Sequence, residues 1–553
     1  MAYINIPSLN YNNLKFHLTF KEKSSTQEKI FISYSLNHYL SNIKLQIHDH
    51  NNFWDYYKKL TNPYEFIHTQ VPDIKVSICK YKPLSRSFFK MIEIINTFSF
   101  LSEKNTINCF HLAEGPGGFI EAFNYKRNNK GDKYYGMTLI AEDINIPSWK
   151  KSSHFINNNN NVIIEYGSTK TGDLFMKENL IYCFNNYANS MDYITGDGGF
   201  DFSVDFNKQE DLSMKLILAQ IFFAIIMQKE GGNFVLKIFD IFKLKTVEII
   251  FLLTNLYDYV YIYKPYTSRI ANSEKYIVCK NYKNNNKNIT NEIINNFDYL
   301  LDNIDCIYSL FNIALPKLFL KKIEEINAIY GQQQIENINT TLNFIREYIN
   351  IKHNNYHVSD SEGDDISYEN KFNPTIDPYI DCSNNINPTR IENFRDTELV
   401  NDLFKLDSNN RAYNSPIINP KTKFSYILNE KQFTLNHNDI AFGNISRSSS
   451  NTDNDNDNDN DNDNDNDNDN DNDNHNDNDN DNDNDNDNGS KSSSCNEKEE
   501  ILCNLIKDTK FLSISNYDKF NNKINVLKNI NIQKSVNWCN KYNFSINKHF
   551  ANI

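Results

Sequence analysis

Short apolar runs alternate with longer amphipathic segments between residues 109 and 282. The runs have the length of strands, and the amphipathic segments repeat with helical periodicity. A sheet built from such units is parallel or mostly parallel, with helices on both faces. The predicted strands are CFHLAEG (109–115), YYGMTLI (134–140), VIIEYG (162–167), MDYITGD (191–197), NFVLKIF (233–239), YVYIYKP (259–265) and KYIVCKNY (275–282). The predicted helices are GGFIEAFNYK (117–126), VEIIFLLTNLYD (247–258) and a buried one, LSMKLILAQIFFAIIMQKEG (212–231), which Gly231-Gly232 would stop.

The pattern changes on both sides of this region. Upstream, segment 54–68 reads as an aromatic-rich helix closed near Asn62-Pro63, and segment 86–101 has helical spacing. Downstream, segment 307–331 reads as helical. The predicted organisation is a helical or mixed N-terminal extension (1–80), an α/β domain (81–285), a helical extension (286–352), a disordered linker (353–496) and a small helical C-terminal segment (497–553) that could dock back on the main domain.

The charge of the chain comes from one segment. The formal charge is −14, but the Asp-Asn repeat (453–488) holds 17 Asp, which leaves +3 for the rest. The repeat has no apolar side chain to bury, so we expect it to be disordered, whether as an interaction tail or as neutral expansion. It lacks the Gly-punctuated loop and terminal Glu of a calcium site. The acidity therefore says little about the surface that meets a substrate.

Nine cysteines without a CxxC pair indicate neither a disulfide framework nor a zinc site, so no metal is predicted. The N-terminus does not read as a signal peptide, and apolar stretches such as 216–227 are too short to span a bilayer. We expect a soluble intracellular protein that does not contact a membrane. Its compartment could be the nucleus, the cytoplasm or a viral factory, and the sequence does not indicate an oligomeric state.

Candidate chemistry lies just after the predicted strands, where ligands bind in open α/β sheets. A strand runs into Glu114, Gly115, Pro116, Gly117, Gly118 and Phe119, and then a helix begins. Glycines let backbone approach a ligand, and a helix N-terminus offers unpaired N–H groups, although a purely structural turn would read the same.

Four further residues have chemical potential but ordinary default readings. Asp197 ends a strand, and Lys237 lies inside an apolar one, where an unpaired ammonium is costly to bury unless it snorkels. Lys90 on a predicted helix reads by default as a surface lysine, and Glu274 as a solvated glutamate at a strand edge.

The order of these residues resembles the FtsJ-like (RrmJ-type) RNA 2′-O-ribose methyltransferases, and is most similar to the Adrift-type and viral mRNA cap enzymes. The resemblance covers about residues 50–285. The strings that carry it are TNPYEFIHT (61–69), SRSFFKMIE (85–93), LAEGPGGFIEAF (112–123), TGDL (171–174), TGDGGFDFS (195–203), GGNFVLKIFDIF (231–242) and KPYTSRIANSEKYIVCK (264–280).

The resemblance implies a Rossmann-like methyltransferase fold, S-adenosylmethionine as cofactor and RNA as substrate. It implies a catalytic tetrad of Lys90, Asp197, Lys237 and Glu274. The implied cofactor contacts are Glu114, Gly115, Pro116, Gly117, Gly118, Phe119, Asp143, Asp173 and Asp197. In the family the glycine loop more often begins Asp-Leu-Gly or Cys-Glu-Ala, which leaves the role of Glu114 open.

The resemblance favours methylation of the first or second transcribed nucleotide of capped mRNA, with possible contacts to capping or transcription machinery. Two alternatives stay open: an rRNA or tRNA 2′-O-methyltransferase, and an inactive RNA-binding subunit of the same fold. Basic residues near the predicted active edge could contact phosphates, and Phe202 and Tyr266 could stack on bases. The basic candidates are Arg86, Lys243, Lys245, Lys264, Arg269 and Lys275.

Overall fold

The computed structural model describes residues 3–9, 11, 14–21, 30–101, 103–140, 148–200, 205–283, 287–359 and 497–551. Of the predicted linker (353–496), residues 353–359 belong to a described helix and residues 360–496, with the Asp-Asn repeat, lie outside the described residues. Asp143 and Phe202 also lie outside the described residues. None of the described helices combines the length and apolar character needed to cross a bilayer.

One eight-stranded sheet forms the centre, in the order β1-β8-β9-β7-β6-β3-β4-β5. Its strands are β1 (Ile4–Ile6), β3 (Asn108–Leu112), β4 (Lys133–Met137), β5 (Val162–Ile164), β6 (Met191–Gly196), β7 (Gln228–Ile238), β8 (Tyr257–Tyr263) and β9 (Lys275–Tyr282). Strands β5, β4, β3, β6 and β7 are mutually parallel, while β9 runs antiparallel to both β7 and β8, and β1 antiparallel to β8. The Rossmann-like, mostly parallel sheet is therefore confirmed.

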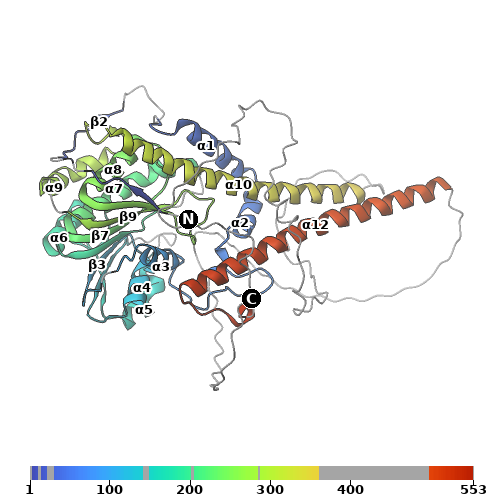
Figure 1. The fold of residues 1–553 in the computed structure, drawn as a ribbon, viewed down its shortest axis with the longest axis horizontal. Helices are drawn as coiled ribbons and strands as arrows, with labels where there is room; N and C mark the ends of the chain where they lie inside the picture. Colours follow the sequence, from blue (N-terminus) through green and yellow to red (C-terminus); the bar gives the residue numbers. More distant parts are fainter. Residues whose placement is uncertain are drawn as a thin grey trace, which may run out of the picture. The chain divides into compact units, whose positions relative to one another are not determined.

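Helices cover both faces of this sheet (Figure 1). One face carries α3 (Ser87–Thr97), α4 (Gly118–Arg127) and α5 (Ser153–Asn158); the other carries α6 (Lys177–Tyr187), α7 (Gln209–Met227), α8 (Leu244–Leu256) and α9 (Lys287–Asp302). The main hydrophobic core lies between the sheet and the helices of the second face. Its helices α7 and α8 are apolar almost all round, as expected for helices that are buried on most sides.

The remaining elements lie outside the α/β core. They are α1 (Tyr34–His48), α2 (Asn51–Leu60), the small sheet of β2 (Thr19–Phe20) and β10 (Ile307–Ser309), and two long helices, α10 (Lys317–Ser359) and α12 (Glu497–Lys541). Short 3-10 turns follow at η1 (Glu65–Ile67), η2 (Trp149–Ser152), η3 (Phe206–Lys208) and η4 (Lys548–Phe550).

Two predicted boundaries are wrong. Gly231-Gly232 does not stop the long helix: α7 ends at Met227, and β7 begins directly at Gln228, with Gly231 inside the strand at φ +75°. The Gln228 side chain donates to Met191 O at 2.9 Å, which starts the pairing with β6 earlier than the glycines suggest. Segment 307–331 is not one helix, because 307–309 pairs as a strand with β2.

Candidate active site

The carboxyl ends of two neighbouring strands bring the first pair of predicted catalytic residues together. Asp197 follows β6 directly, and Lys237 lies near the end of the adjacent parallel strand β7. The Lys237 Nζ is 3.4 Å from Asp197 Oδ1, and both side chains are largely buried, at 13% and 14% exposure. Lys237 therefore pairs with Asp197 at the carboxyl edge rather than snorkelling to bulk water.

The second pair joins a helix to the start of β9. Lys90 lies on α3, and its Nζ is 2.9 Å from Glu274 Oε1. Both residues are buried, so the default readings of a surface lysine and a solvated glutamate are wrong. Ser268 Oγ donates to the same Oε1 at 2.8 Å. The described contacts thus give each lysine its own carboxylate.

Tyr276 connects the two pairs, and the sequence reasoning missed it. Its hydroxyl donates to Asp197 Oδ1 at 2.9 Å and lies 3.4 Å from Glu274 Oε1. Tyr276 is opposite Lys237 in the β7–β9 register. The missed signal was the two-residue spacing from Glu274, since alternate residues of an extended chain point to the same side.

The electrostatics of the cluster follow from burial and from its lysines. Burial alone would raise the pKa of Glu274, but Lys90, Lys237 and Lys264 outweigh it and hold that pKa below its ordinary value. Burial, with Lys275 and Lys90 nearby, holds the pKa of Lys264 well below its ordinary value although Glu274 opposes this. Glu274 is therefore an anion at neutral pH.

The glycine loop lies between β3 and α4. Glu114 is buried, and its Oε1 accepts from the N–H groups of Phe119 at 2.7 Å and Ile120 at 3.1 Å, at the start of α4. Its other oxygen, Oε2, is buried with no hydrogen-bond partner among the described residues. Burial and the charge of Asp197 raise the pKa of Glu114 well above its ordinary value. Part of the helix N-terminus is thus satisfied by the chain itself, while one carboxyl oxygen is left for a donor.

Gly117 and Gly118 of this loop cannot readily be replaced by larger residues, each for a different reason. Gly117 has φ +111°, a conformation that side chains rarely adopt. A Cβ on Gly118 would overlap the Ser85 and Ser87 hydroxyls at the start of α3. The loop therefore packs tightly on the helix that carries Lys90. Beyond it, the Phe119 ring is fully buried, 6.0 Å from that of Tyr276.

Of Asp143 and Asp173, the two implied cofactor contacts between the glycine loop and Asp197, the structure describes only Asp173. Asp173 follows β5, and its Oδ1 accepts from Phe175 N at 2.8 Å within its own turn. A Cβ on Gly172 would overlap Thr138 O, so this turn packs against the carboxyl end of β4. Asp173 consequently lies at the same edge of the sheet as Glu114.

The basic residues proposed as phosphate contacts are engaged within the protein. Arg269 binds the buried Glu65 carboxylate at 3.1 and 2.7 Å, and Arg86 donates to Thr267 O at 3.0 Å. Lys245, Lys264 and Lys275 are buried with backbone carbonyls as acceptors, and Lys243 pairs with Asp211. Tyr266 packs on Tyr64, with the ring centroids 5.1 Å apart. These side chains therefore have partners within the protein, which their residue types alone could not have revealed.

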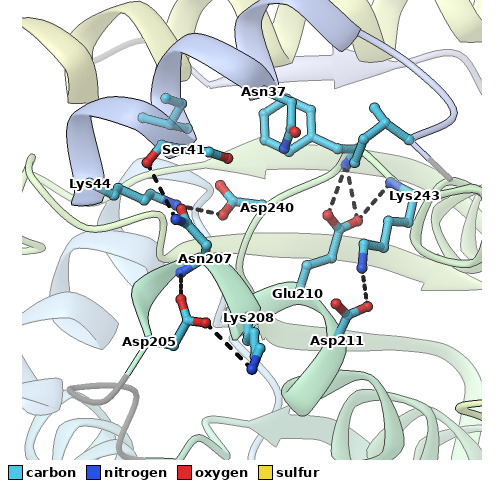
Figure 2. Close-up of a pocket in the computed structure, with 13 residues that line it drawn as sticks. Asn37, Ser41, Lys44, Asp205, Asn207, Lys208, Glu210, Asp211, Asp240 and Lys243 are labelled. Atoms are coloured by element: carbon cyan, nitrogen blue, oxygen red, sulfur yellow. Dashed lines mark hydrogen bonds and ion pairs between the residues drawn. The ribbon is translucent and has the colours of Figure 1, made fainter. Parts of the chain in front are cut away.

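A cavity of about 380 Å³ lies next to the turn after β7, and Figure 2 shows the residues that line it. Helix α1, the start of α7 and the turn after β7 line it. Lys44 pairs with Asp240 at 2.8 Å, and Glu210 accepts from the N–H groups of Phe242 and Lys243. Burial, with Asp240 nearby, raises the pKa of Glu210 to about 7, although Thr246 and Lys243 oppose this. Acidic and basic groups thus line the cavity together, and one of them, Asp240, lies three residues beyond Lys237.

The mostly parallel sheet, with two lysine–carboxylate pairs at its carboxyl edge, has the layout that was predicted for a Rossmann-like methyltransferase fold. Residues 83–282 match the family model described as FtsJ-like methyltransferase. The predicted resemblance to that family is confirmed over these residues.

Curated relatives carry names from mRNA cap chemistry. The chain is 28% identical to cap-specific mRNA (nucleoside-2′-O-)-methyltransferase 2 of Danio rerio, over 56% of this chain and 42% of that protein. It is 31% identical to cap-specific mRNA (nucleoside-2′-O-)-methyltransferase 1A of Caenorhabditis briggsae, over 41% of this chain and 27% of that protein. It is 29% identical to the protein of that organism named inactive cap-specific mRNA (nucleoside-2′-O-)-methyltransferase 1B, over 41% of this chain and 28% of that protein. The chain therefore spans less than half the length of these relatives.

Proposed function

We propose that the chain transfers a methyl group from S-adenosylmethionine to a ribose 2′-hydroxyl of RNA, at the first or second transcribed nucleotide of capped mRNA. The observation that carries the proposal is the Lys237–Asp197 pair, 3.4 Å apart at the carboxyl edge of the sheet, with Lys90–Glu274 joined to it through Tyr276. The names of the curated relatives favour capped mRNA over other RNA.

The residues at the edge fit S-adenosylmethionine. The buried Glu114 Oε2 lacks a partner among the described residues. A methionine ammonium would donate to it, and its positive charge would oppose the rise in the pKa of Glu114 that burial and Asp197 cause. The backbone of Gly115, Pro116 and Gly117 follows it in the same loop, and we assign Asp173, which follows the outer strand β5, to the ribose of the cofactor. When bound, the cofactor supplies an electrophilic methyl group on a sulfonium.

The chain's own residues then orient the hydroxyl and move its proton. The new bond joins the 2′-oxygen to the methyl carbon as the bond from carbon to sulfur breaks, and the hydroxyl proton must leave. Lys237 Nζ, as the neutral amine, steers the oxygen and takes the proton, and the ammonium that forms is paired by Asp197. Tyr276 holds Asp197 in place through its hydroxyl. Lys90 and Glu274 form the second ion pair of the same cluster, which Tyr276 joins to the first.

The test uses the full chain, labelled S-adenosylmethionine and short RNAs that differ at the 5′ end. We expect transfer to capped RNA, little transfer to uncapped RNA, and loss of transfer when the target nucleotide carries a 2′-deoxy group. Equal labelling of capped and uncapped RNA would favour the rRNA or tRNA alternative. Cofactor binding without transfer to any of these RNAs would favour the inactive subunit, a possibility raised by the relative named inactive.

A further inference from the structure

The C-terminal segment of the chain pairs through its backbone with residues 78–80, which precede α3. Lys80 N donates to Ser545 O at 2.9 Å, and Asn547 N donates to Ile78 O at 3.0 Å, around an antiparallel bridge between Cys79 and Ile546. Figure 1 shows the end of α12 beside α3. This segment lies outside residues 83–282, which match the family model.

Aromatic side chains from this segment pack on the outer face of α3. The Trp538 ring lies 5.5 Å from that of Phe89, nearly perpendicular, and the Phe544 ring lies 5.8 Å from Phe89 and 5.9 Å from Phe88. All four side chains are buried. Phe89 directly precedes Lys90, so this packing fixes the turn of α3 from which Lys90 reaches the catalytic edge.

A buried carboxylate extends the contact to the rest of the site. Glu93, on the next turn of α3, is fully buried and accepts from Tyr266 N at 2.7 Å and Thr267 N at 2.8 Å. Burial raises the pKa of Glu93, although the Thr267 donors, Tyr266 N and the nearby Trp538 side chain counteract it. The loop that Glu93 holds continues to Ser268, which donates to Glu274.

We propose that residues 538–547 position the Lys90–Glu274 pair for catalysis. One route runs from Trp538 and Phe544 through Phe89 to Lys90, and the other runs through Glu93 and its loop to Glu274. The segment is therefore part of the working catalytic unit although it is separated from the α/β domain by more than two hundred residues of sequence. The inference rests on the proposed methyl transfer for its kinetic readout only.

The test compares Trp538→Ala with Asn531→Ala in the full chain. Asn531 is also buried on α12, but its side chain donates to Leu60 O at the end of α2, away from α3. Both changes should lower Tm. We expect only Trp538→Ala to reduce kcat for methyl transfer, by about 10- to 100-fold, because small displacements of a catalytic group carry costs of that order. Affinity for S-adenosylmethionine should stay within about twofold, and Trp538→Phe should recover most of kcat, since it keeps the ring contact.

Hydrogen exchange gives a readout that needs no activity. Trp538→Ala should speed amide exchange in α3, residues 87–97, and Asn531→Ala should not. If Trp538→Ala unfolds the chain, Phe544→Leu serves in its place with the same expectations. An unchanged kcat together with unchanged α3 exchange would overturn the inference, as would an equal loss of kcat in Asn531→Ala. Absence of transfer by the unaltered chain would instead reject the proposed function, and α3 exchange would still decide the positioning role.

Discussion

Tyr276→Phe removes one oxygen atom from the centre of the proposed site. The hydroxyl donates to Asp197 at 2.9 Å and lies 3.4 Å from Glu274, and the side chain is fully buried. Burial, with Asp197 and Glu274 nearby, raises the pKa of Tyr276 well above its ordinary value, so the hydroxyl keeps its proton through the neutral range.

The size of the effect follows from the charge of the acceptor. A hydrogen bond to an ionised group contributes about 1.5–3 kcal/mol, and each 1.4 kcal/mol corresponds to about tenfold. If the bond keeps Asp197 against Lys237 during methyl transfer, kcat should fall by about 10- to 100-fold. Affinity for S-adenosylmethionine should change little, because the substitution removes only the hydroxyl and keeps the ring that lies beside Phe119 of the glycine loop.

Tyr257→Phe is the matched control. Tyr257 is equally buried on the neighbouring strand β8, but its hydroxyl donates at 3.2 Å to the neutral amide oxygen of Gln228, at the start of β7 and far along the strand from Lys237. It should lose about 1 kcal/mol of stability and no activity. Single-turnover transfer, equilibrium cofactor binding and urea unfolding measure the three quantities. The reasoning fails if Tyr276→Phe keeps kcat within about threefold, or if Tyr257→Phe loses as much.

Three other substitutions test separate parts of the structure. Burial raises the pKa of Glu121 to about 7, so the folded state retains a proton that the unfolded state loses first, and stability falls as pH rises from about 4.5 to 7. In urea unfolding, Glu121→Gln should therefore be up to about 3 kcal/mol more stable than wild type at pH 8. The gain should be much smaller at pH 4. Glu65→Gln leaves the Arg269 guanidinium without its buried anion and should cost about 3–5 kcal/mol, which a drop in Tm would report; an unchanged Tm would contradict this. Gly172→Ala combines φ +64° with overlap on Thr138 O, so calorimetry should show weaker cofactor binding, and unchanged affinity would count against a role for that turn.

The alternating pattern predicted the individual strands and the edge of the sheet where the site lies, because each strand is marked by a local pattern. Each strand is a short apolar run, and parallel strands place their carboxyl ends at one edge. Asp197 could therefore be placed at that edge from the sequence, while the grouping of all four catalytic residues depended on the family resemblance. Lys90 lies on a helix and Glu274 precedes an antiparallel strand, so neither follows from the strand pattern.

Contacts between residues far apart along the chain could not be predicted from the sequence. The basic residues near the edge looked free, but Arg269 belongs to Glu65, which lies 204 positions away along the chain. The glycine pair after α7 looked like a helix stop, because glycine commonly follows the last turn of a helix. Residues 228–230 are polar and carry no apolar alternation that would have marked the start of a strand. The packing of Trp538 on α3 has no local signature in either segment.

The most direct measurement compares Lys237→Ala with Lys229→Ala in methyl transfer to capped RNA. Both lysines lie on β7, but Lys229 is half-exposed at the opposite end, 3.5 Å from Asp192. Lys237→Ala should slow transfer by about 10²–10⁴-fold while cofactor binding persists, and Lys229→Ala should behave as wild type. A Lys237→Ala chain that still transfers methyl groups within about tenfold of the wild-type rate would contradict the assignment of the proton to that amine.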